Sequence, residues 1–199
     1  FGTYGFPLSK IKSNLNLNLT AQYSRNPGIL NRELNYTANP SIGFGAVLSS
    51  NISEKVDFTL SSNSSKTYSL SSLSPNQNTD YFNQSTTAKA YWNLWKGLVV
   101  RTSLSHQYYA GLSDSFDPNY FLWGAGLGYK FMKDNKAEIG LEAFDILGQN
   151  QALSRATTET YYEDISTNTL QQYVMLTFRY NFDKFISVEK DDRPKSPRD

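Results

Sequence analysis

The 199-residue chain contains no cysteine, a single histidine and no apolar run close to the roughly 20 residues of a membrane-spanning helix. The lack of cysteine excludes disulfides and thiolate metal sites. The lack of long apolar runs excludes a protein that crosses a membrane by helices. A net charge of +1, with lysine and arginine spread along the chain, argues against nucleic acid as a partner.

What the chain does contain is a long alternation of apolar and polar residues. From Ile11 to Tyr23 the odd positions are apolar or small and the even positions are polar. Successive residues of a strand face opposite sides, so this segment would have one apolar and one polar face. Its length matches the about 9–11 residues of a tilted strand that crosses a bilayer. A soluble sandwich could also use one such strand, so recurrence of the pattern is what decides.

The alternation recurs and predicts an all-β fold, an antiparallel transmembrane β-barrel with eight strands in this chain. The predicted strands span 11–23, 42–48, 56–60, 81–95, 100–108, 121–131, 137–143 and 173–182. Glycines at 124, 126 and 128 would leave room on the inner face or allow close curvature of the backbone. The mean hydropathy of −0.52 fits a barrel, because half of each strand faces a polar interior. Charged residues of the strands fall on the inner face: Lys12, Lys89, Arg101, Lys130, Glu138, Glu142 and Arg179.

The connections between these strands alternate in length. Short turns are predicted at 51–55, 96–97 and 133–136, and long loops at 24–41, 61–80, 110–119 and 148–168. The strand that begins at Val56 is expected to project beyond the membrane before its loop. Such asymmetry is typical of barrels in the outer membrane of Gram-negative bacteria, whose short turns lie in the periplasm.

Aromatic residues are placed where membrane-interface girdles would lie. The predicted short-turn girdle consists of Trp92, Trp95, Tyr129, Phe131, Tyr180 and Phe182. The predicted long-loop girdle consists of Tyr23, Tyr68, Tyr108, Tyr120 and Phe121.

No group of residues has the composition of a catalytic site, so the chain is not expected to be an enzyme, and no cofactor or metal is expected. His106 has no partner histidine and is interpreted as a surface residue. Glu138 and Glu142 are predicted to form ion pairs inside the barrel, with Lys130 across a short turn or with Arg179 on the next strand.

Two acidic groups in loops lack the spacing of a calcium loop. They are Asp114 with Asp117, and Glu159 with Glu163 and Asp164. Two aromatic pairs, Tyr81–Phe82 and Tyr161–Tyr162, could stack on a ligand at the outer face. The identity of any ligand is not determined by the sequence.

The predicted domain organisation is a barrel segment over residues 1–182 and a charged periplasmic tail over 183–199. A tail of this composition is usually disordered, and it either binds a periplasmic or barrel-plugging partner or rests on the barrel rim. The chain begins at Phe1 without the charged and apolar segments of a secretory signal, so any signal was removed or lay outside this fragment.

Several segments resemble the carboxyl-terminal barrel of Bacteroidetes outer-membrane proteins related to TonB-dependent receptors of the Sus type. The segments are 4–8 followed by 10–18, 120–131, 144–150, 154–161 and 173–182. The resemblance implies a barrel of about 22 strands, of which these eight are the last. It also implies an upstream plug and, in many members, a small periplasmic β-sandwich.

Three functions follow as alternatives. The first is nutrient or ligand transport across the outer membrane, with oligosaccharide, peptide or chelate as solute and a surface lipoprotein as possible partner. The second is a scaffold subunit of a larger secretion or assembly complex. The third is a self-contained eight-stranded barrel, an adhesin or anchor, in which strand 11–23 closes onto strand 172–182. In each case the lipid bilayer is the expected environment, and in the first two other strands or subunits complete the barrel.

Overall fold

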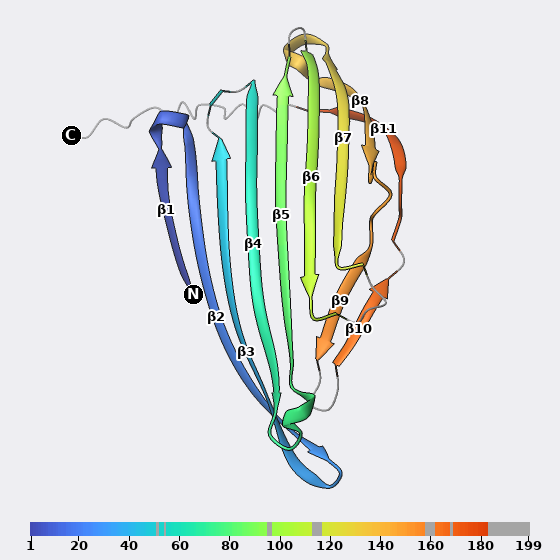
Figure 1. The fold of residues 1–199 in the computed structure, drawn as a ribbon. Helices are drawn as coiled ribbons and strands as arrows, with labels where there is room; N and C mark the ends of the chain where they lie inside the picture. Colours follow the sequence, from blue (N-terminus) through green and yellow to red (C-terminus); the bar gives the residue numbers. More distant parts are fainter. Residues whose placement is uncertain are drawn as a thin grey trace, which may run out of the picture.

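The computed structural model describes residues 1–50, 52–53, 55–94, 97–112, 117–157, 162–167 and 169–182. They form one curved antiparallel sheet of nine strands in the order β1-β2-β3-β4-β5-β6-β7-β8-β11, and a separate two-stranded sheet, β9 with β10 (Figure 1). No helix in the described ranges has the length and apolar character needed to cross a membrane.

From β2 onward, the strands of the main sheet become shorter along the chain. Their bounds are β1 Gly2–Leu8, β2 Ser13–Leu30, β3 Glu33–Ser50, β4 Val56–Ser71, β5 Thr79–Asn93, β6 Leu98–Ala110, β7 Asn119–Phe131, β8 Ala137–Phe144 and β11 Tyr173–Tyr180. The small sheet contains β9 Ala152–Thr157 and β10 Tyr162–Thr167. Among the described residues, connections contain the single-turn 3₁₀ helices η1 Ser9–Ile11, η2 Pro75–Gln77 and η4 Lys133–Asn135.

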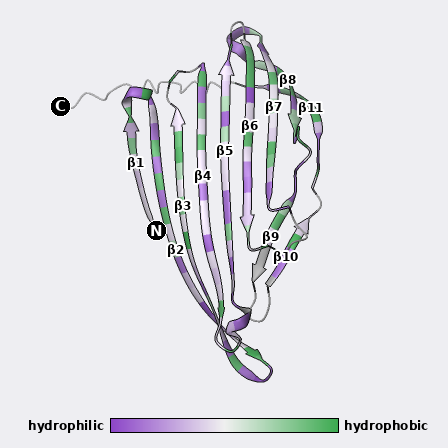
Figure 2. Cartoon of the chain, in the orientation of Figure 1, coloured by the Kyte–Doolittle hydropathy of each residue, from purple (hydrophilic) through white to green (hydrophobic). Residues whose placement is uncertain are grey.

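The register places the predicted outward residues in continuous rows on one side of the sheet. One row runs through Val100, Leu127, Leu141 and Leu176 on β6, β7, β8 and β11. Leu127, Leu141 and Leu176 are between half and three-quarters exposed, so this side, the apolar face, has no protein cover. The residues between them form the opposite polar face, and Figure 2 shows the resulting alternation of hydrophobic and hydrophilic residues along the strands. Large exposed apolar areas of this kind mark contact with a membrane or a partner.

The apolar band crosses the rows of paired residues obliquely. Leu60 is the last apolar residue of the band on β4, whereas Leu15 is the first on β2, yet both pair with Leu48 of β3. If the band is level in a bilayer, the strands must therefore tilt. Strand tilt and stagger of this kind are what barrel closure requires.

All eight predicted strands are present, and the short connections at 51–55, 96–97 and 133–136 are confirmed by the strand bounds on either side. The strand from Val56 continues to Ser71, as expected for a strand that projects beyond the membrane. Only 72–78 of the predicted loop 61–80 is therefore a connection. The connection after Ala110 is also confirmed, since β7 begins at Asn119.

The prediction of a loop at 24–41 is wrong. β2 and β3 are each 18 residues long and pair throughout this region, from Ser24 with Asn39 to Leu30 with Glu33. Asn31 and Arg32 close the hairpin with φ of 54° and 70°, the left-handed values of a type I′ turn. The Asn-Pro-Gly and Asn-Pro sequences favoured a loop, but Pro27 and Pro40 are accommodated in the ladder. A strand of this length is about 60 Å long and exceeds what a bilayer crossing needs.

Two further predictions about the chain's first strand need correction. Ile11 belongs to η1 and Lys12 has a left-handed φ of 44°, so the strand begins at Ser13 and Lys12 is not on its polar face. Gly2–Leu8 forms an additional strand, which pairs with 13–19. Because β2 pairs with β1 and β3, the predicted closure of 11–23 directly onto 172–182 is wrong.

The segment 148–168, predicted as a loop, contains the β9–β10 hairpin. The tail at 183–199 lies outside the described residues, as do Trp95 and Tyr161.

Candidate functional site

The polar face carries a network of charged side chains from three strands. Glu138 on β8 forms ion pairs with Arg101 on β6, at 2.6 Å, and with Arg179 on β11, at 3.2 Å. Arg179 also pairs with Glu142 at 2.7 Å. The predicted ion pairs of Glu138 and Glu142 with Arg179 are thus confirmed. Arg101 is a partner that sequence reasoning missed, because it lies two strands away from Glu138.

Lys130, the other predicted partner, makes a different contact. It stands opposite Glu138 in the register, but its ammonium donates a hydrogen bond to the Tyr91 hydroxyl at 3.0 Å. The Arg101 guanidinium also lies over the Tyr91 ring, 5.6 Å from its centre. Cations over a tyrosine face are attracted to the ring quadrupole.

The glycines of β7 make space for this network, as the sequence predicted. A Cβ added at Gly128 would lie 2.8 Å from Glu138 Oε1 and 3.0 Å from Arg101 Nη1. A Cβ at Gly126 would lie 3.1 Å from the Glu142 side chain. The two residues therefore leave room for long charged side chains to pass over the backbone of β7.

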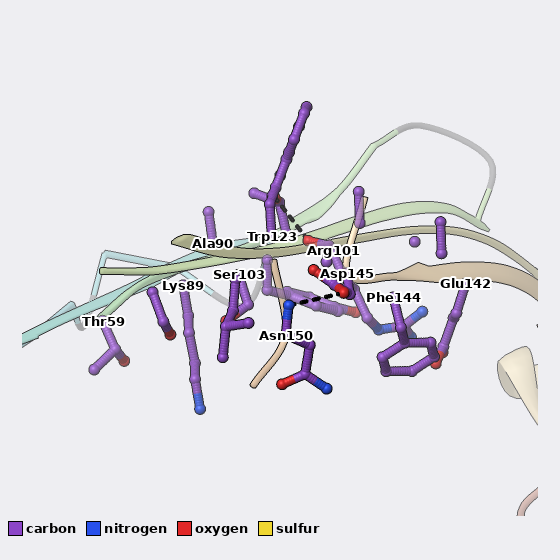
Figure 3. Close-up of a pocket in the computed structure, with 18 of the residues that line it drawn as sticks. Thr59, Lys89, Ala90, Arg101, Ser103, Trp123, Glu142, Phe144, Asp145 and Asn150 are labelled. Atoms are coloured by element: carbon purple, nitrogen blue, oxygen red, sulfur yellow. Dashed lines mark hydrogen bonds between the residues drawn. The ribbon is translucent and has the colours of Figure 1, made fainter. Parts of the chain in front are cut away.

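A cavity of about 800 Å³ lies beside this network on the polar face. Its floor comes from β4 to β8 and β11, and residues of the connection after β8 form another wall. Figure 3 shows Thr59, Lys89, Ser103, Asn150 and Phe144 projecting to one side of the sheet, while Trp123 projects to the other. The size falls within the range of small-molecule sites, about 300–1,000 Å³.

The connection after β8, which forms one wall of the cavity, is held in place by Asp145. This residue is buried and has a left-handed φ of 49°. Its carboxylate accepts hydrogen bonds from the backbone N–H groups of Gln149 and Asn150, both at 3.0 Å. The Asn150 side chain then donates to the Leu170 carbonyl at 3.0 Å, which ties the two ends of the connection together. The turn around Asp145 is therefore held in place by its own carboxylate.

Comparison with protein families decides what kind of protein has this sheet. The model of the outer membrane protein beta-barrel family matches residues 6–180. The chain belongs to this family. The protein is accordingly located in the outer membrane. Its apolar face is the lipid-facing side of a barrel, and its polar face lines the barrel interior. Searches of curated proteins and of solved structures gave no significant match.

The remaining candidate residues of this outer-membrane barrel are not brought together. His106 stacks on Phe121 at 4.7 Å on the lipid-facing side, and its Nε2 hydrogen-bonds Asn119 Oδ1 at 2.6 Å, which agrees with a surface role. Asp117 accepts a hydrogen bond from the Asn119 backbone N–H. Among the described residues, no three His, Cys, Asp or Glu side chains are placed to hold a metal. Asp114 and Glu159 lie outside those residues, and Glu163 and Asp164 are part of β10.

The two members of the aromatic pair Tyr81–Phe82 face opposite sides of the barrel wall. Phe82 contacts Tyr108 on the lipid-facing side, whereas Tyr81 stacks on Tyr109 at 6.1 Å on the interior side. Tyr109 in turn stacks on Tyr120 at 6.1 Å. Tyr120 is 4% exposed and donates a hydrogen bond to the Gln151 carbonyl, so its predicted place in the lipid girdle is wrong. Its even position on β7 was the signal that could have placed it inside.

Proposed function

We propose that this barrel wall is part of a larger, TonB-dependent receptor-type barrel that imports a solute across the outer membrane. The observation that carries the proposal is the pair of open sheet edges. In the described sheet β1 pairs only with β2, and β11 pairs only with β8. An unpaired backbone group in lipid costs several kcal/mol, so both edges need further strands.

The polar, interior-facing side of the sheet supports a role in solute import. The cavity and the surrounding network provide charged, hydroxyl and aromatic groups within one concavity. Transport sites combine an apolar surface with a few well-placed polar groups in the same way. A wall that served only as a membrane anchor would need no such cavity.

The proposal includes partners. Upstream strands and a plug of the same barrel would pair with the open edges and fill the interior, and a surface lipoprotein would bind at the end with the long connections. The lipid bilayer would contact the apolar face. The periplasmic partner of the 183–199 tail stays a prediction, because the tail lies outside the described residues.

The first test is the intact mass of the protein extracted from its own outer membrane, combined with peptide mapping. We expect a mass several times the 22.5 kDa of this sequence, with plug peptides upstream of residue 1. A mass near 22.5 kDa, with no co-purifying strands to complete the sheet, would overturn the larger barrel.

The second test addresses import. A deletion strain and its complemented parent are grown on a defined mixture of oligosaccharides, peptides and iron chelates, and depletion of each solute is measured with and without a protonophore. We expect one solute class to be taken up only by the complemented strain and only without the protonophore. Equal depletion by both strains would overturn the transport role and favour the scaffold alternative.

A further inference from the structure

Lys89 is the one cation of the cavity whose charge the described residues leave uncompensated. Its neighbours in the register are Thr59 on β4 and Ser103 on β6, and it makes no hydrogen bond or ion pair with any described residue. The other two cations of the lining, Arg101 and Arg179, are paired with Glu138 and Glu142. Lys89 is thus the cation of the lining that has no ion-pair partner among the described residues, and Figure 3 shows its side chain projecting to the same side of the sheet as Thr59 and Ser103.

Each carboxylate that lines the cavity already accepts a hydrogen bond or an ion pair from a group other than Lys89. Glu142 is held by Arg179 at 2.7 Å. Asp145 accepts two backbone N–H groups at 3.0 Å. Asp57 accepts a hydrogen bond from the Ser50 hydroxyl. Among the described residues no ion pair joins Lys89 to any of these three acids, and the residues directly opposite it, Thr59 and Ser103, offer hydroxyls that can donate to an anion.

The opposite wall of the same cavity is flat and apolar. Phe144 and Tyr173 stack at 4.6 Å with an interplanar angle of 14°, and both line the cavity. Leu122 and Leu170 extend this surface. A ligand that fits must therefore combine a negative charge at one end with a flat or apolar body at the other.

We propose that this cavity binds a small amphiphilic organic anion, with Lys89 as the contact for its carboxylate or phosphate group and Phe144–Tyr173 as the surface for its ring. A charge-assisted hydrogen bond is stronger than a neutral one, so the lysine supplies most of the discrimination between charged and neutral ligands. This inference rests on the proposed import function and extends it by naming a class of solute. Because binding is measured in an assay without transport, the binding proposal and the import proposal can each fail independently of the other.

The test uses the full-length protein in lipid nanodiscs, with empty nanodiscs as background, and saturation-transfer NMR titrations. The probes are benzoate, phenyl phosphate, neutral benzamide and inorganic phosphate. We expect benzoate and phenyl phosphate to bind at least about tenfold more tightly than benzamide. Whichever of the two anions binds more tightly identifies the class of acid group. Equal binding of benzoate and benzamide would overturn the proposal, as would inorganic phosphate binding as tightly as phenyl phosphate.

Variants assign the effect to the residue. Lys89→Gln should weaken benzoate and phenyl phosphate about tenfold and leave benzamide unchanged, whereas Lys89→Arg should retain binding. Lys10→Gln makes the same change of charge in η1, away from the cavity, and should behave as wild type. Phe144→Leu should weaken both aromatic anions and spare inorganic phosphate. Unchanged binding in Lys89→Gln, or an equal loss in Lys10→Gln, would show that the cavity lysine is not the contact.

Discussion

Arg101 on β6 and Glu138 on β8 form an ion pair of 2.6 Å across the intervening strand β7. Neighbouring strands are about 4.8 Å apart, so the two side chains together span about twice that distance over the backbone of β7. They pass where Gly128 has no side chain. Arg101 Nη1 is buried and has no hydrogen-bond partner in the described part of the chain, while Nη2 forms the ion pair with the carboxylate. The contact thus depends on a glycine in a strand that contributes neither charge.

Gly128→Ala should destabilise the barrel. Its Cβ would meet Glu138 Oε1 at 2.8 Å and Arg101 Nη1 at 3.0 Å, so the pair must shift, at a cost of about 1–3 kcal/mol. Gly124→Ala is the matched control on the same strand, because its Cβ would meet only the Ala143 carbonyl at 3.5 Å. The measurement is the urea midpoint of unfolding from lipid vesicles. Equal midpoints for the two variants would contradict the role of Gly128.

Glu138→Gln should remove the charge that two arginines share. We expect a loss of about 1–3 kcal/mol in the free energy of unfolding, because Arg101 and Arg179 then repel each other without a carboxylate between them. In a double-mutant cycle, Arg101→Gln and Glu138→Gln should cost less together than the sum of their separate effects. Glu33→Gln, at the exposed end of the β2–β3 hairpin, is the control for a lost carboxylate. Additive effects in the cycle would show that the pair contributes nothing.

Adjacent residues of β11 should respond oppositely to the same substitution. Leu176 lies on the lipid-facing side and Met175 on the interior side. Leu176→Arg should therefore cost about 2–4 kcal/mol in folding free energy, whereas Met175→Arg should cost much less. The measurement is the yield and urea stability of the barrel folded into vesicles. The assignment of the two faces would be wrong if Met175→Arg were the more damaging change.

The hairpin of β2 and β3 should be protected from hydrogen exchange almost to its turn. Alternate amides at 24–30 and 33–39, those that point across the hairpin, should exchange slowly, and those at 73–77 quickly, because only the first two ranges lie in paired strands. Arg32→Val should accelerate exchange near the turn, since a β-branched residue disfavours a φ of 70°, and Arg32→Gly should not. Fast exchange throughout 24–39 in the unmodified protein would restore the loop interpretation.

By itself, the sequence determined the two faces of the wall. Residues such as Leu127, Leu141 and Leu176 could be assigned to lipid from a period of two, because side chains in a strand alternate regardless of their neighbours. The strands that this periodicity defined also marked the short turns between them. The alternation of short turns with long connections indicated the outer membrane as the environment. It also placed Glu138 and Arg179 on the inside, and their pairing followed from adjacent strands.

The tertiary structure alone decided where pairing extends and which residues meet. The hairpin through Pro27 and Asn31 is stabilised by a long ladder of backbone hydrogen bonds, which overrides local loop preferences that a sequence displays. Strand β1 could be recognised as a strand only from its pairing with β2. The contact of Arg101 with Glu138, and the cavity in which Lys89 has no ion-pair partner among the described residues, depend on register and curvature across several strands. Local sequence encodes the face of each residue, but its neighbours across the sheet are set by the pairing of distant segments.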